Sequence, residues 1–502
     1  MTTKIADIFI IGGGINGAGI ARDASGRGLK VILVEQGDLA SATSSASSKL
    51  IHGGLRYLEQ YDFKLVRDSL LEREVLWKIA PHLIKPLRFV LPHHRGLRPR
   101  WLLRLGLFLY DHIGGRKLLP ATKSLNLATH RMGKPLKETY TKAFEYSDCA
   151  VDDARLVILN ALDAAQRGAT ILTRHRFTGA KRQNGWWFID VKNPSGQTTH
   201  YKAKALVNAA GPWVDKVLKD CHPRREPKSH IRLVKGSHII VPKLYDHDQA
   251  YTFQSADGRI IFSIPYEGKF TLIGTTDVPF ESAPNSAAAS EEEIEYLCTL
   301  ASEYFKSQIQ PKSVVSTYSG VRALYDDGIE NSSKTTREYI LELDATDDAL
   351  PLVSIFGGKL TSYRHLGEDV MEKLRPFLET SRKTWTKSAP LPGGDMDGRK
   401  NPARAIERLI NTIGSFAPWL DPDIVARLAH AYGTRAFDLL DGAQRPSDLG
   451  QYFGAGLYET EVAFLIRHEW AQSCEDILWR RSKLGLHMNE KERADLEKYM
   501  QK

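Results

Sequence analysis

The chain has 502 residues, of which 42% are hydrophobic, and this length predicts two or three folded domains. The formal net charge of +9 is a modest excess, which suits an anionic small substrate or an anionic membrane surface. We expect neither a signal peptide nor a spanning helix, and the four widely separated cysteines argue against a disulfide framework, a metal site and an iron–sulfur cluster.

A glycine-rich motif near the N-terminus predicts a dinucleotide site. The apolar run at residues 8–11 leads into a G-x-G-x-x-G that begins at Gly12. Gly12 permits the tight turn, Gly14 leaves room for a pyrophosphate, and Gly17 lets the next helix pack closely on the strand. That helix presents N–H groups and its dipole to the phosphates. A second predicted strand ends on Glu35, whose carboxylate can accept both ribose hydroxyls, but the motif does not distinguish FAD from NAD.

The stretch after Glu35 is rich in serine and threonine. Residues 41–48 fit either a solvated loop or a bed of hydroxyl and N–H groups for a pyrophosphate and a flavin. The second interpretation predicts cofactor contacts from Thr43, Ser47, Ser48 and Lys49. The sequence His-Gly-Gly-Leu-Arg-Tyr follows, in which two glycines allow close approach to a flat ring while His52 and Arg56 bring polar groups beside it.

Residues 86–119 combine basic and apolar side chains. The predicted helix 101–110 is about 15 Å long, half of a hydrocarbon core, so it cannot span a bilayer. Arginine, tryptophan and leucine together favour a helix that lies in an anionic membrane interface. The alternative is a core helix with snorkelling arginines. The basic residues of this segment are Arg88, Arg95, Arg98, Arg100, Arg104, Arg116 and Lys117.

The middle of the chain alternates between helix and strand patterns. Residues 62–81 predict a helix, and 146–174 predict an aspartate-capped helix followed by a strand. A strand at 186–191 follows the Asn184-Gly185 hairpin turn. The buried strand within 205–215 ends at Ala-Gly-Pro, where Gly211 lets the chain pass close to a bound cofactor.

The second half of the chain begins with a predicted antiparallel sheet. It covers 231–277, with turns at Asp257-Gly258 and Glu267-Gly268. Residues 351–366 predict a strand, a Gly-Gly turn and a helix start that faces a dinucleotide. A Pro- and Gly-rich linker at 388–398 precedes a tail whose pattern is wholly helical.

Several segments together resemble a known family. These are IGGGINGAGIARDASGRGL, SSASSKLIHGGLRYLE, FEYSDCAVDDARL, VNAAGPWVD, KGSHIIVP, IGTTD, YSGVRAL and FGGKLTSYR. They are similar to those of FAD-dependent respiratory glycerol-3-phosphate dehydrogenases, and the similarity covers nearly the whole chain. Ala323 and Ser362 stand where members of that family often carry proline and threonine.

The resemblance implies an α/β flavoprotein of the D-amino-acid-oxidase type. Its parts are a Rossmann-like FAD-binding domain, an antiparallel-sheet substrate domain and a C-terminal all-α domain. The FAD-binding part is expected at about 1–80, 145–230 and 340–388, the substrate part at about 81–144 and 231–339, and the helical domain at 389–502.

The resemblance also implies a reaction and its partners. The expected reaction oxidises sn-glycerol 3-phosphate to dihydroxyacetone phosphate, with hydride transfer from C2 to N5 of FAD and electrons then passing to ubiquinone or menaquinone. It further implies a cytoplasmic homodimer bound peripherally to the inner face of the cytoplasmic membrane. The sequence contains one dinucleotide fingerprint in full context; a second glycine cluster at 454–456 lies in the tail without a preceding strand. If FAD fills the single site, the substrate must reduce the flavin directly.

Candidate roles follow from the chemistry of alcohol oxidation. The hydroxyl proton needs a base, for which His52 is the first choice and His238 the second. Arg322 is the expected phosphate clamp, because a guanidinium forms charge-assisted bonds to phosphate. The other expected contacts are Arg56 as a second cation, Lys359 near flavin N1 and C2=O, Tyr57 and Thr361 as hydroxyl donors, and Gly358 beside the cofactor.

Other functions remain open at this point. An oxidase would return electrons to oxygen and would need no basic apolar surface. A flavin-containing nucleic-acid-modifying or nucleic-acid-binding protein would need a continuous basic groove with stacking aromatics. No recognised nucleic-acid-binding motif is present, so we expect no nucleic-acid partner. A catalytically silent membrane-associated scaffold would bind flavin without being reduced by a polyol phosphate.

Overall fold

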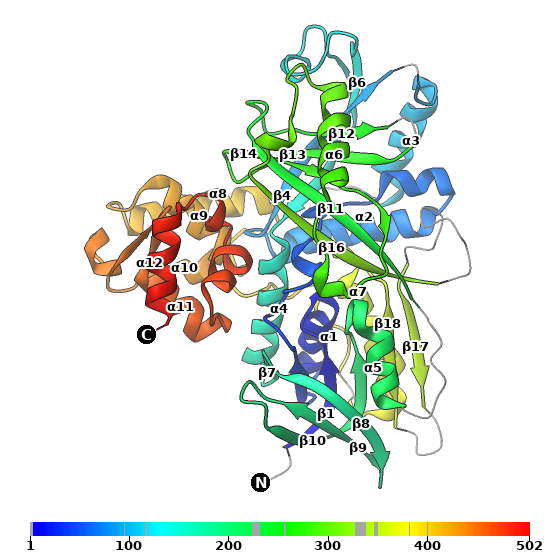
Figure 1. Cartoon of the computed structure of the whole chain (residues 1–502), viewed down its shortest axis with the longest axis vertical. Helices are drawn as coiled ribbons and strands as arrows, with labels where there is room; N and C mark the ends of the chain where they lie inside the picture. Colours follow the sequence, from blue (N-terminus) through cyan, green and yellow to red (C-terminus); the bar gives the residue numbers. More distant parts are fainter. Residues whose placement is uncertain are drawn as a thin grey trace.

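The computed structural model describes residues 4–94, 96–115, 118–222, 231–255, 258–326, 338–345, 350–380, 382–398 and 400–501. Two sheet-based layers form an elongated body, and the C-terminal helices pack against its side (Figure 1). Three basic residues of the segment discussed above (Arg95, Arg116, Lys117) and the turn residue Asp257 lie outside the described residues.

The first sheet carries the glycine motif. Its strand order is β17-β18-β10-β1-β2-β7, and the pairs from β18 to β7 are parallel. The β8–β9 hairpin extends the sheet from β10. The bounds are β1 Lys4–Ile11, β2 Val31–Val34, β7 Thr170–Leu172, β8 Arg176–Gln183, β9 Trp186–Lys192, β10 Thr198–Asn208, β17 Ile340–Asp344 and β18 Leu352–Phe356.

Apolar side chains on both faces of this sheet are buried, which explains the continuous hydrophobic runs of β1 and β2. On one face, Ile8 and Ile10 pack in a core shared with four helices, one of which is α2 (Phe63–Ile79). On the other face, Phe9 and Ile11 pack against the β8–β9 hairpin and the helix α5. The helices are α1 Ile15–Gly26, α4 Asp153–Gln166, α5 Val214–Cys221 and α7 Tyr363–Leu374.

The second sheet runs in the order β15-β11-β14-β13-β12-β4-β6-β3, with β16 added to β11 and β5 to β6. All of its pairs are antiparallel except β12 with β4. The predicted hairpins are therefore confirmed, and the turn at Glu267-Gly268 has positive φ at both residues. The bounds are β3 Leu50–Ile51, β4 Ile84–His93, β5 Lys123–Asn126, β6 Lys142–Val151, β11 Ile231–Pro242, β12 Ala250–Gln254, β13 Ile260–Tyr266, β14 Phe270–Gly274, β15 Val278–Pro279 and β16 Ser316–Tyr325.

Two strands in this sheet correct the sequence interpretation. Residues 86–93, taken as the start of a basic apolar segment, belong to β4 and lie inside the sheet. Residues 146–151, predicted as part of the capped-helix segment 146–174, instead belong to β6, which pairs with β4 over its whole length. Two prolines and an arginine hide the strand pattern of β4. Both faces of much of β6 are buried, so no polar alternation marks it.

Three more helices complete the main body around the sheets. Helix α2 (Phe63–Ile79) begins at Asp62, whose carboxylate accepts a hydrogen bond from the Leu65 N–H. Helix α3 (Arg100–Ile113) lies beside it, and helix α6 (Glu291–Tyr304) packs on β11. Asp152 caps α4 in the same way, by accepting from the Arg155 N–H, as the sequence predicts.

The C-terminal domain has its own apolar core. Contrary to the prediction of a wholly helical tail, it contains a two-stranded hairpin and a π-helical turn, Asp476–Arg481. The glycine cluster 454–456 forms the turn of this hairpin and does not lie at the cavity described below. The bounds are α8 Pro402–Phe416, α9 Pro422–Tyr432, α10 Ala436–Leu440, β19 Tyr452–Gly454, β20 Leu457–Tyr458, α11 Glu459–Glu469 and α12 Glu490–Met500.

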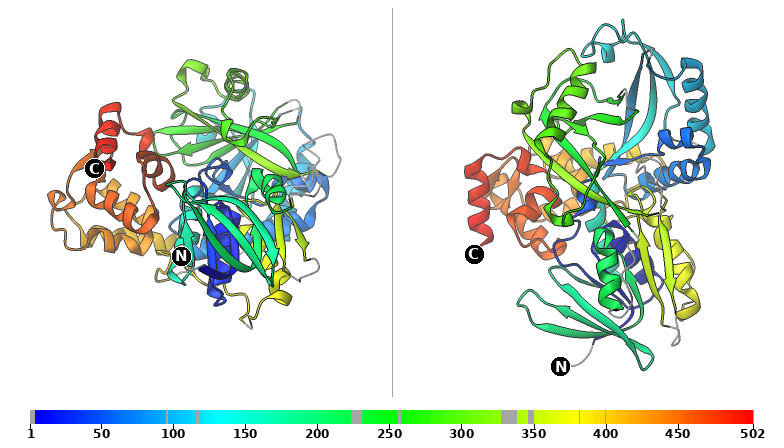
Figure 2. Two further views of the ribbon diagram at one scale, coloured as in Figure 1. Left: turned by 60° about the horizontal axis from the view of Figure 1, so that its bottom comes forward. Right: turned by 45° about the vertical axis from the view of Figure 1, so that its right-hand side comes forward.

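The predicted linker 388–398 packs between the main body and this domain. Leu391 is fully buried and its N–H donates to the carbonyl of Ile79 at 2.8 Å, whereas Met396 belongs to the C-terminal core. Figure 2 shows the C-terminal domain against the side of the first sheet in both views. The residue ranges proposed for the three parts stay a prediction.

Candidate functional site

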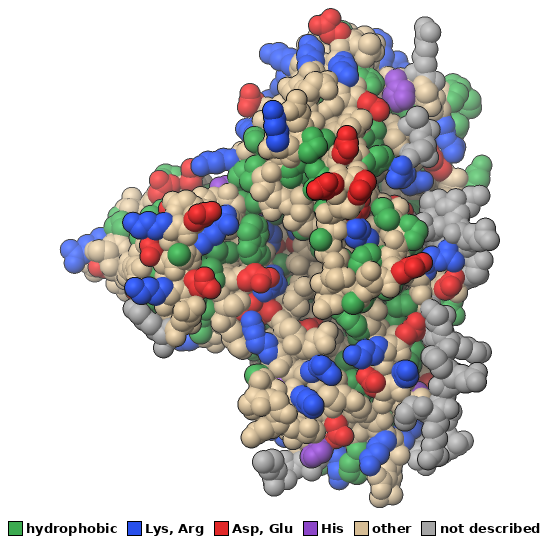
Figure 3. All heavy atoms as spheres, in the orientation of Figure 1, with side chains coloured by type: hydrophobic (Ala, Val, Ile, Leu, Met, Phe, Trp, Pro, Cys, Tyr) green, Lys and Arg blue, Asp and Glu red, His purple; other side chains and the backbone are tan. Residues whose placement is uncertain are grey.

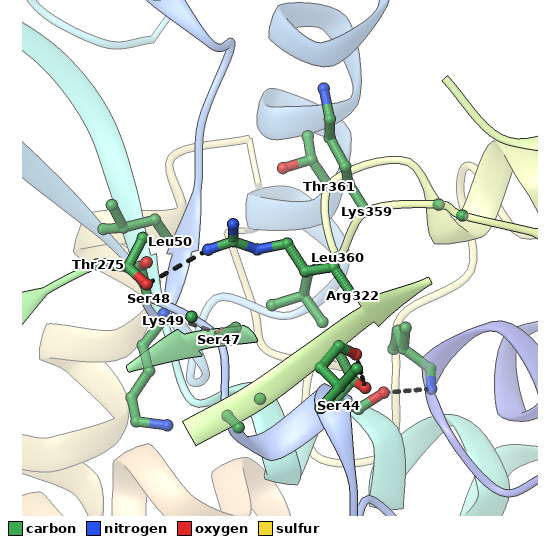
Figure 4. A pocket seen from close by; sticks show the side chains of 18 of the residues that line it. Ser44, Ser47, Ser48, Lys49, Leu50, Thr275, Arg322, Lys359, Leu360 and Thr361 are labelled. Atoms are coloured by element: carbon green, nitrogen blue, oxygen red, sulfur yellow. Dashed lines mark hydrogen bonds between the residues drawn. The ribbon is translucent and has the colours of Figure 1, made fainter. Parts of the chain in front are cut away.

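A cavity of about 1320 Å³ lies between the two sheets. Every site residue that the sequence singles out lines this cavity, except Gly17. Segments far apart in the chain therefore meet at one place: the glycine motif, the Ser/Thr-rich loop, the strands β11 and β16, and the turn after β18 (Figure 4).

The glycine motif has the geometry that its spacing predicts. Gly12 has a φ of +111°, and a Cβ atom there would lie 2.4 Å from the carbonyl oxygen of Ala209. A Cβ atom on Gly17 would lie 1.9 Å from the carbonyl oxygen of Gly12, so only glycine lets α1 approach the turn this closely. Gly14 is the N-cap of α1 and offers no capping side chain, which leaves the first turn of the helix facing the cavity.

Glu35 connects the glycine turn to the next loop. One carboxylate oxygen accepts the Gly13 N–H at 2.7 Å, and the other accepts the Gly37 N–H at 2.8 Å. Burial raises the pKa of this carboxyl, and the two N–H donors oppose that effect. Each oxygen keeps a further lone pair, so the carboxylate can still accept a ribose hydroxyl.

The predicted hydroxyl bed is itself held by hydrogen bonds. Thr43 donates to the carbonyl of Val321 at 2.6 Å, and Ser47 donates to the carboxylate of Asp153 at 2.8 Å. The ammonium of Lys49 lies 3.0 Å from the same carboxylate. These side chains therefore fix the shape of the loop, and its backbone faces the cavity together with them.

Ser44, which the sequence analysis did not select, contacts the glycine helix directly. Its hydroxyl accepts the N–H of Ile15 at 3.0 Å, beside the first turn of α1 (Figure 4). Asp153 was also missed, although it follows the predicted cap residue Asp152. The reason is that its partners lie more than a hundred residues earlier in the chain.

One wall of the cavity brings residues 52–57 against 359–361. The N–H of His52 donates to the Thr361 hydroxyl at 3.3 Å, and that hydroxyl lies 3.4 Å from the His52 carbonyl. The ammonium of Lys359 lies 3.9 Å from the centre of the Tyr57 ring. Thr361 therefore positions the backbone of His52, a role that the sequence did not suggest.

Burial lowers the pKa of the His52 imidazole. Burial, together with the positive charges of Lys359 and Arg73, lowers the pKa of His52 below 6.5 against the opposing charge of Asp148. A neutral imidazole can accept a proton at physiological pH. Among the described residues, no side chain forms a hydrogen bond with the His52 ring.

A buried network that sequence analysis missed supports this wall. The carboxylate of Asp148 accepts the N–H of Gly53 at 3.2 Å, the hydroxyl of Tyr110 at 2.8 Å and the guanidinium of Arg73 at 2.6 Å. Gly53 follows His52 directly, so these bonds fix the segment that carries the candidate base.

The opposite wall is formed by the paired strands β11 and β16. His238 on β11 stacks on Tyr318 of β16 with a ring distance of 4.7 Å. Its Nε2 atom lies 2.9 Å from the Ser48 hydroxyl. Burial, with the positive charges of Lys49 and Arg322, lowers the pKa of His238 well below 6.5. His238 is thus neutral as well, but its Nε2 atom already forms a hydrogen bond with Ser48.

Arg322 reaches the same wall from β16. Its guanidinium donates to the Thr275 hydroxyl at 3.3 Å, as the dashed line in Figure 4 marks, and lies 3.3 Å from the Asp277 carboxylate. Gly236 opposite leaves the space for it, since a Cβ atom there would lie 2.5 Å from Nη2. Arg56 and Lys359 are also among the basic side chains that line the cavity, and a ligand that contacts all three would be favoured if it is anionic.

The amino-acid sequence matches two family models, which together cover most of its length. The family of FAD dependent oxidoreductases matches residues 7–344, and the C-terminal domain of alpha-glycerophosphate oxidase matches residues 384–501. A glycerol-3-phosphate dehydrogenase of Pseudomonas aeruginosa is 50% identical over 498 residues, which is 99% of this chain and 95% of that protein. The chain belongs to the FAD-dependent glycerol-3-phosphate dehydrogenase family.

Other members of this family and related proteins are also similar. A D-erythritol 1-phosphate dehydrogenase of Brucella abortus is 50% identical, over 98% of this chain and 97% of that protein. The structure of the glycerol-3-phosphate dehydrogenase from Bacillus halodurans, solved with FAD, has a TM-score of 0.76 at 27% identity and covers 100% of this chain and 95% of that one. The expected family, fold class and cofactor are confirmed.

FAD is the cofactor of this glycerol-3-phosphate dehydrogenase family member, and the described residues fit its dinucleotide part. The first turn of α1 and the backbone at Gly12 and Gly14 would hold the pyrophosphate, and Glu35 would hold the ribose. Gly211 and Gly358 have φ values of +53° and +96°, which lets the backbone at both positions line the cavity closely.

Helix α3 carries an exposed apolar face. Trp101 is 70% exposed and Phe108 is 50% exposed, whereas Leu107 and Tyr110 on the other side are buried. One of the basic residues predicted to accompany this helix is placed differently. Arg88 lies on β4 and forms an ion pair with Glu145 at 3.0 Å. Among the described residues, no helix has both the length and the apolar character needed to cross a bilayer.

The C-terminal domain also contributes to the cavity, although its sequence carries no cofactor motif. No local pattern could have found these residues, because only tertiary packing brings them to the site. They are Glu475, Trp479, Arg480, Lys483 and Leu486.

Proposed function

We propose that the protein oxidises sn-glycerol 3-phosphate to dihydroxyacetone phosphate. One observation carries the proposal: the dinucleotide motif, the basic side chains of Arg56, Arg322 and Lys359, and two histidines with lowered pKa line a single cavity. Such a cavity suits a small phosphorylated alcohol that must lie beside a flavin. The relative from Pseudomonas aeruginosa is a glycerol-3-phosphate dehydrogenase, which supports the same substrate.

Different residues of the cavity have different roles in the proposed reaction. Arg322 and Arg56 bind the phosphate, and each charge-assisted hydrogen bond contributes about 1.5–3 kcal/mol. His52 takes the proton of the C2 hydroxyl as the C2 hydride leaves. FAD supplies the hydride acceptor, N5. The ammonium of Lys359 lies over the Tyr57 ring, from where it would contact the ring of a bound flavin. Thr361 positions the backbone of His52.

We prefer His52 to His238 as the base on structural grounds. The Nε2 atom of His238 is engaged with Ser48, and its Nδ1 atom is buried. The ring of His52 lines the cavity, and no hydrogen bond from a described side chain holds it. His238 is therefore better suited to hold Ser48 in the cofactor loop.

The first test is the absorption spectrum of the purified protein without oxygen. Glycerol 3-phosphate should bleach the visible flavin bands within the mixing time, because the substrate reduces the flavin directly. A protein that stays yellow with this substrate would overturn the proposal. Glycerol without phosphate is the matched control, and it should leave the spectrum unchanged.

A four-carbon substrate is the second candidate, because the Brucella abortus relative at the same identity is a D-erythritol 1-phosphate dehydrogenase. The same anaerobic assay decides between them. Faster flavin bleaching by erythritol 1-phosphate than by glycerol 3-phosphate at equal concentration would favour the longer polyol.

We also propose that the protein binds the inner face of the cytoplasmic membrane and passes electrons to ubiquinone or menaquinone. Leu102, Leu105 and Leu109 of α3 line the cavity, and Leu105 and Leu109 are also exposed at the surface, so the apolar face of that helix adjoins the cavity. An acceptor dissolved in lipid would thus lie close to the cavity. An oxidase would instead produce peroxide in stoichiometric amounts without added quinone.

Two further proposals concern partners. A homodimer is proposed, and sedimentation of the purified protein measures it. No nucleic-acid partner is proposed, because basic and acidic side chains are interspersed on the face drawn in Figure 3 rather than gathered in a basic groove.

Replacing Trp101, Leu105 and Phe108 with serine should release the protein from vesicles of anionic lipid. Burial of each such side chain contributes about 1.5–3 kcal/mol, so binding should weaken at least about a hundredfold. Co-sedimentation with vesicles measures the loss.

The matched control replaces three exposed apolar residues elsewhere, Val315, Phe416 and Tyr452. This control should bind vesicles like the unaltered protein. If the two triple variants bind equally well, α3 is not the membrane contact.

A further inference from the structure

The loop that follows β2 is held by the C-terminal domain. Asp38 in this loop is buried, and its carboxylate accepts hydrogen bonds from two adjacent arginines of the π-helical turn. Arg480 Nε donates at 2.6 Å, and Arg481 donates at 2.9 Å from Nη2 and also from Nη1. Asp38 stands next to Gly37, whose N–H binds Glu35, so the contact is continuous with the ribose end of the cofactor site.

The two arginines are themselves fixed within the C-terminal domain. Arg480 lies 2.5 Å from the carboxylate of Asp476, and Arg481 Nε donates to the carbonyl of Glu469 at 3.0 Å. Asp476 also pairs with Arg174, which follows β7 of the first sheet, at 2.7 Å. The π-helical turn is a rare conformation that recurs at functional positions. The turn contributes Trp479 and Arg480 to the cavity, and residues on either side of it line the cavity as well.

The other end of the loop is reached through α4. Asp153 of α4 holds Ser47 and Lys49. The neighbouring Asp152 lies 3.5 Å from the ammonium of Lys483, which lines the cavity from the C-terminal domain. The C-terminal domain is therefore linked to the beginning and to the end of the cofactor loop.

Buried charged groups hold the C-terminal domain against α4. The guanidinium of Arg155 on α4 is fully buried against Glu469 and the carbonyl of Ala431. Although burial opposes its ionisation, Arg155 and Arg435 lower the pKa of Glu469 to about 2. Separation of the domain from α4 would break this buried ion pair.

We propose that the C-terminal domain is a clamp for the cofactor loop, in which Arg480 and Arg481 position residues 37–49 through Asp38 and so set the affinity for FAD. The clamp rests on the FAD site and not on the substrate, so its tests contain no substrate. Arg480 and Arg481 are positioning residues. Their effect on the reaction passes through the loop.

The test compares two arginines of the C-terminal domain that differ in their contact with the loop. Arg481→Lys keeps the positive charge but removes the two-pronged contact with Asp38. Arg427→Lys is the matched control, since Arg427 pairs with both oxygens of Glu461 at 2.7 Å inside the same domain and does not line the cavity. FAD is titrated into each apoprotein, and flavin fluorescence gives the dissociation constant.

We expect Arg481→Lys to raise the FAD dissociation constant at least tenfold and Arg427→Lys to change it less than twofold. The unfolding temperatures of the two apoproteins report the structural cost of each change. Equal FAD affinity in both variants would overturn the clamp, and so would an equal loss in both, because that would be general destabilisation. If Arg481→Lys does not fold, Arg480→Lys, at the edge of the cavity, replaces it with the same expected result.

A second measurement uses the unaltered protein. Because coupling is reciprocal, a domain that tightens FAD binding must itself be held more firmly when FAD is bound. Amide hydrogen exchange in α11, which does not line the cavity, should slow at least tenfold on addition of FAD. Unchanged exchange in α11, with slower exchange in α1, would overturn the proposal.

Discussion

Replacing Arg322 with alanine should lower kcat/KM for glycerol 3-phosphate at least about a hundredfold, through a rise in KM. The guanidinium lies in the cavity wall, and loss of its hydrogen bonds to phosphate removes about 3 kcal/mol. Bound flavin, measured by its absorbance relative to protein, should stay unchanged, because Arg322 contacts Thr275 and Asp277 and does not touch the glycine motif.

Arg232→Ala is the matched control. Arg232 stands on β11, where it pairs with Asp326 at 3.0 Å and does not line the cavity. Its KM should remain within twofold of the unaltered value. If Arg322→Ala loses flavin as much as it loses substrate affinity, the phosphate assignment is wrong.

Replacing His52 with glutamine should lower kcat by about 10²–10⁴-fold, the usual contribution of a general base. Glutamine keeps a similar volume and polarity but cannot take the proton. Single-turnover reduction of the flavin measures this step directly. His238→Gln should have a smaller effect on this rate and should weaken FAD binding, because His238 holds Ser48 of the cofactor loop. The reverse ranking would make His238 the base.

The pH dependence follows from the same residue. The base must be unprotonated, so kcat/KM falls as the pH drops through its pKa. Burial and the charges of Lys359 and Arg73 lower that pKa, so the acid limb should lie below pH 6.5. Replacing Lys359 with methionine removes one of these charges and should move the acid limb to higher pH.

The sequence was most informative where the chain obeys a local rule. Gly12 and Gly17 have backbone geometries or contacts that other residues cannot adopt, and Glu35 stands at a strand end, so their positions could be predicted from spacing. The same holds for the glycine turns and the aspartate caps. Arg322 and Lys359 could be selected from motifs, and the structure brings them to the same cavity as the glycine motif.

The sequence was least informative where function depends on contacts between distant segments. Asp38 and Arg481 are separated by 443 positions, and nothing local marks either of them. Asp148 fixes Gly53 from a strand that was not predicted. The role of Thr361 as a support for the His52 backbone likewise depends on tertiary packing, since its partner lies 309 positions away.

The position of the C-terminal turn has a consequence for biosynthesis. The ribosome adds residues 475–486 of the cavity long after it has made the glycine motif of the same cavity. At about 5–20 residues per second, the glycine motif waits roughly 25–95 s for this wall. If the C-terminal domain sets the affinity for FAD as proposed above, a chain truncated before residue 475 should retain less flavin than the unaltered chain.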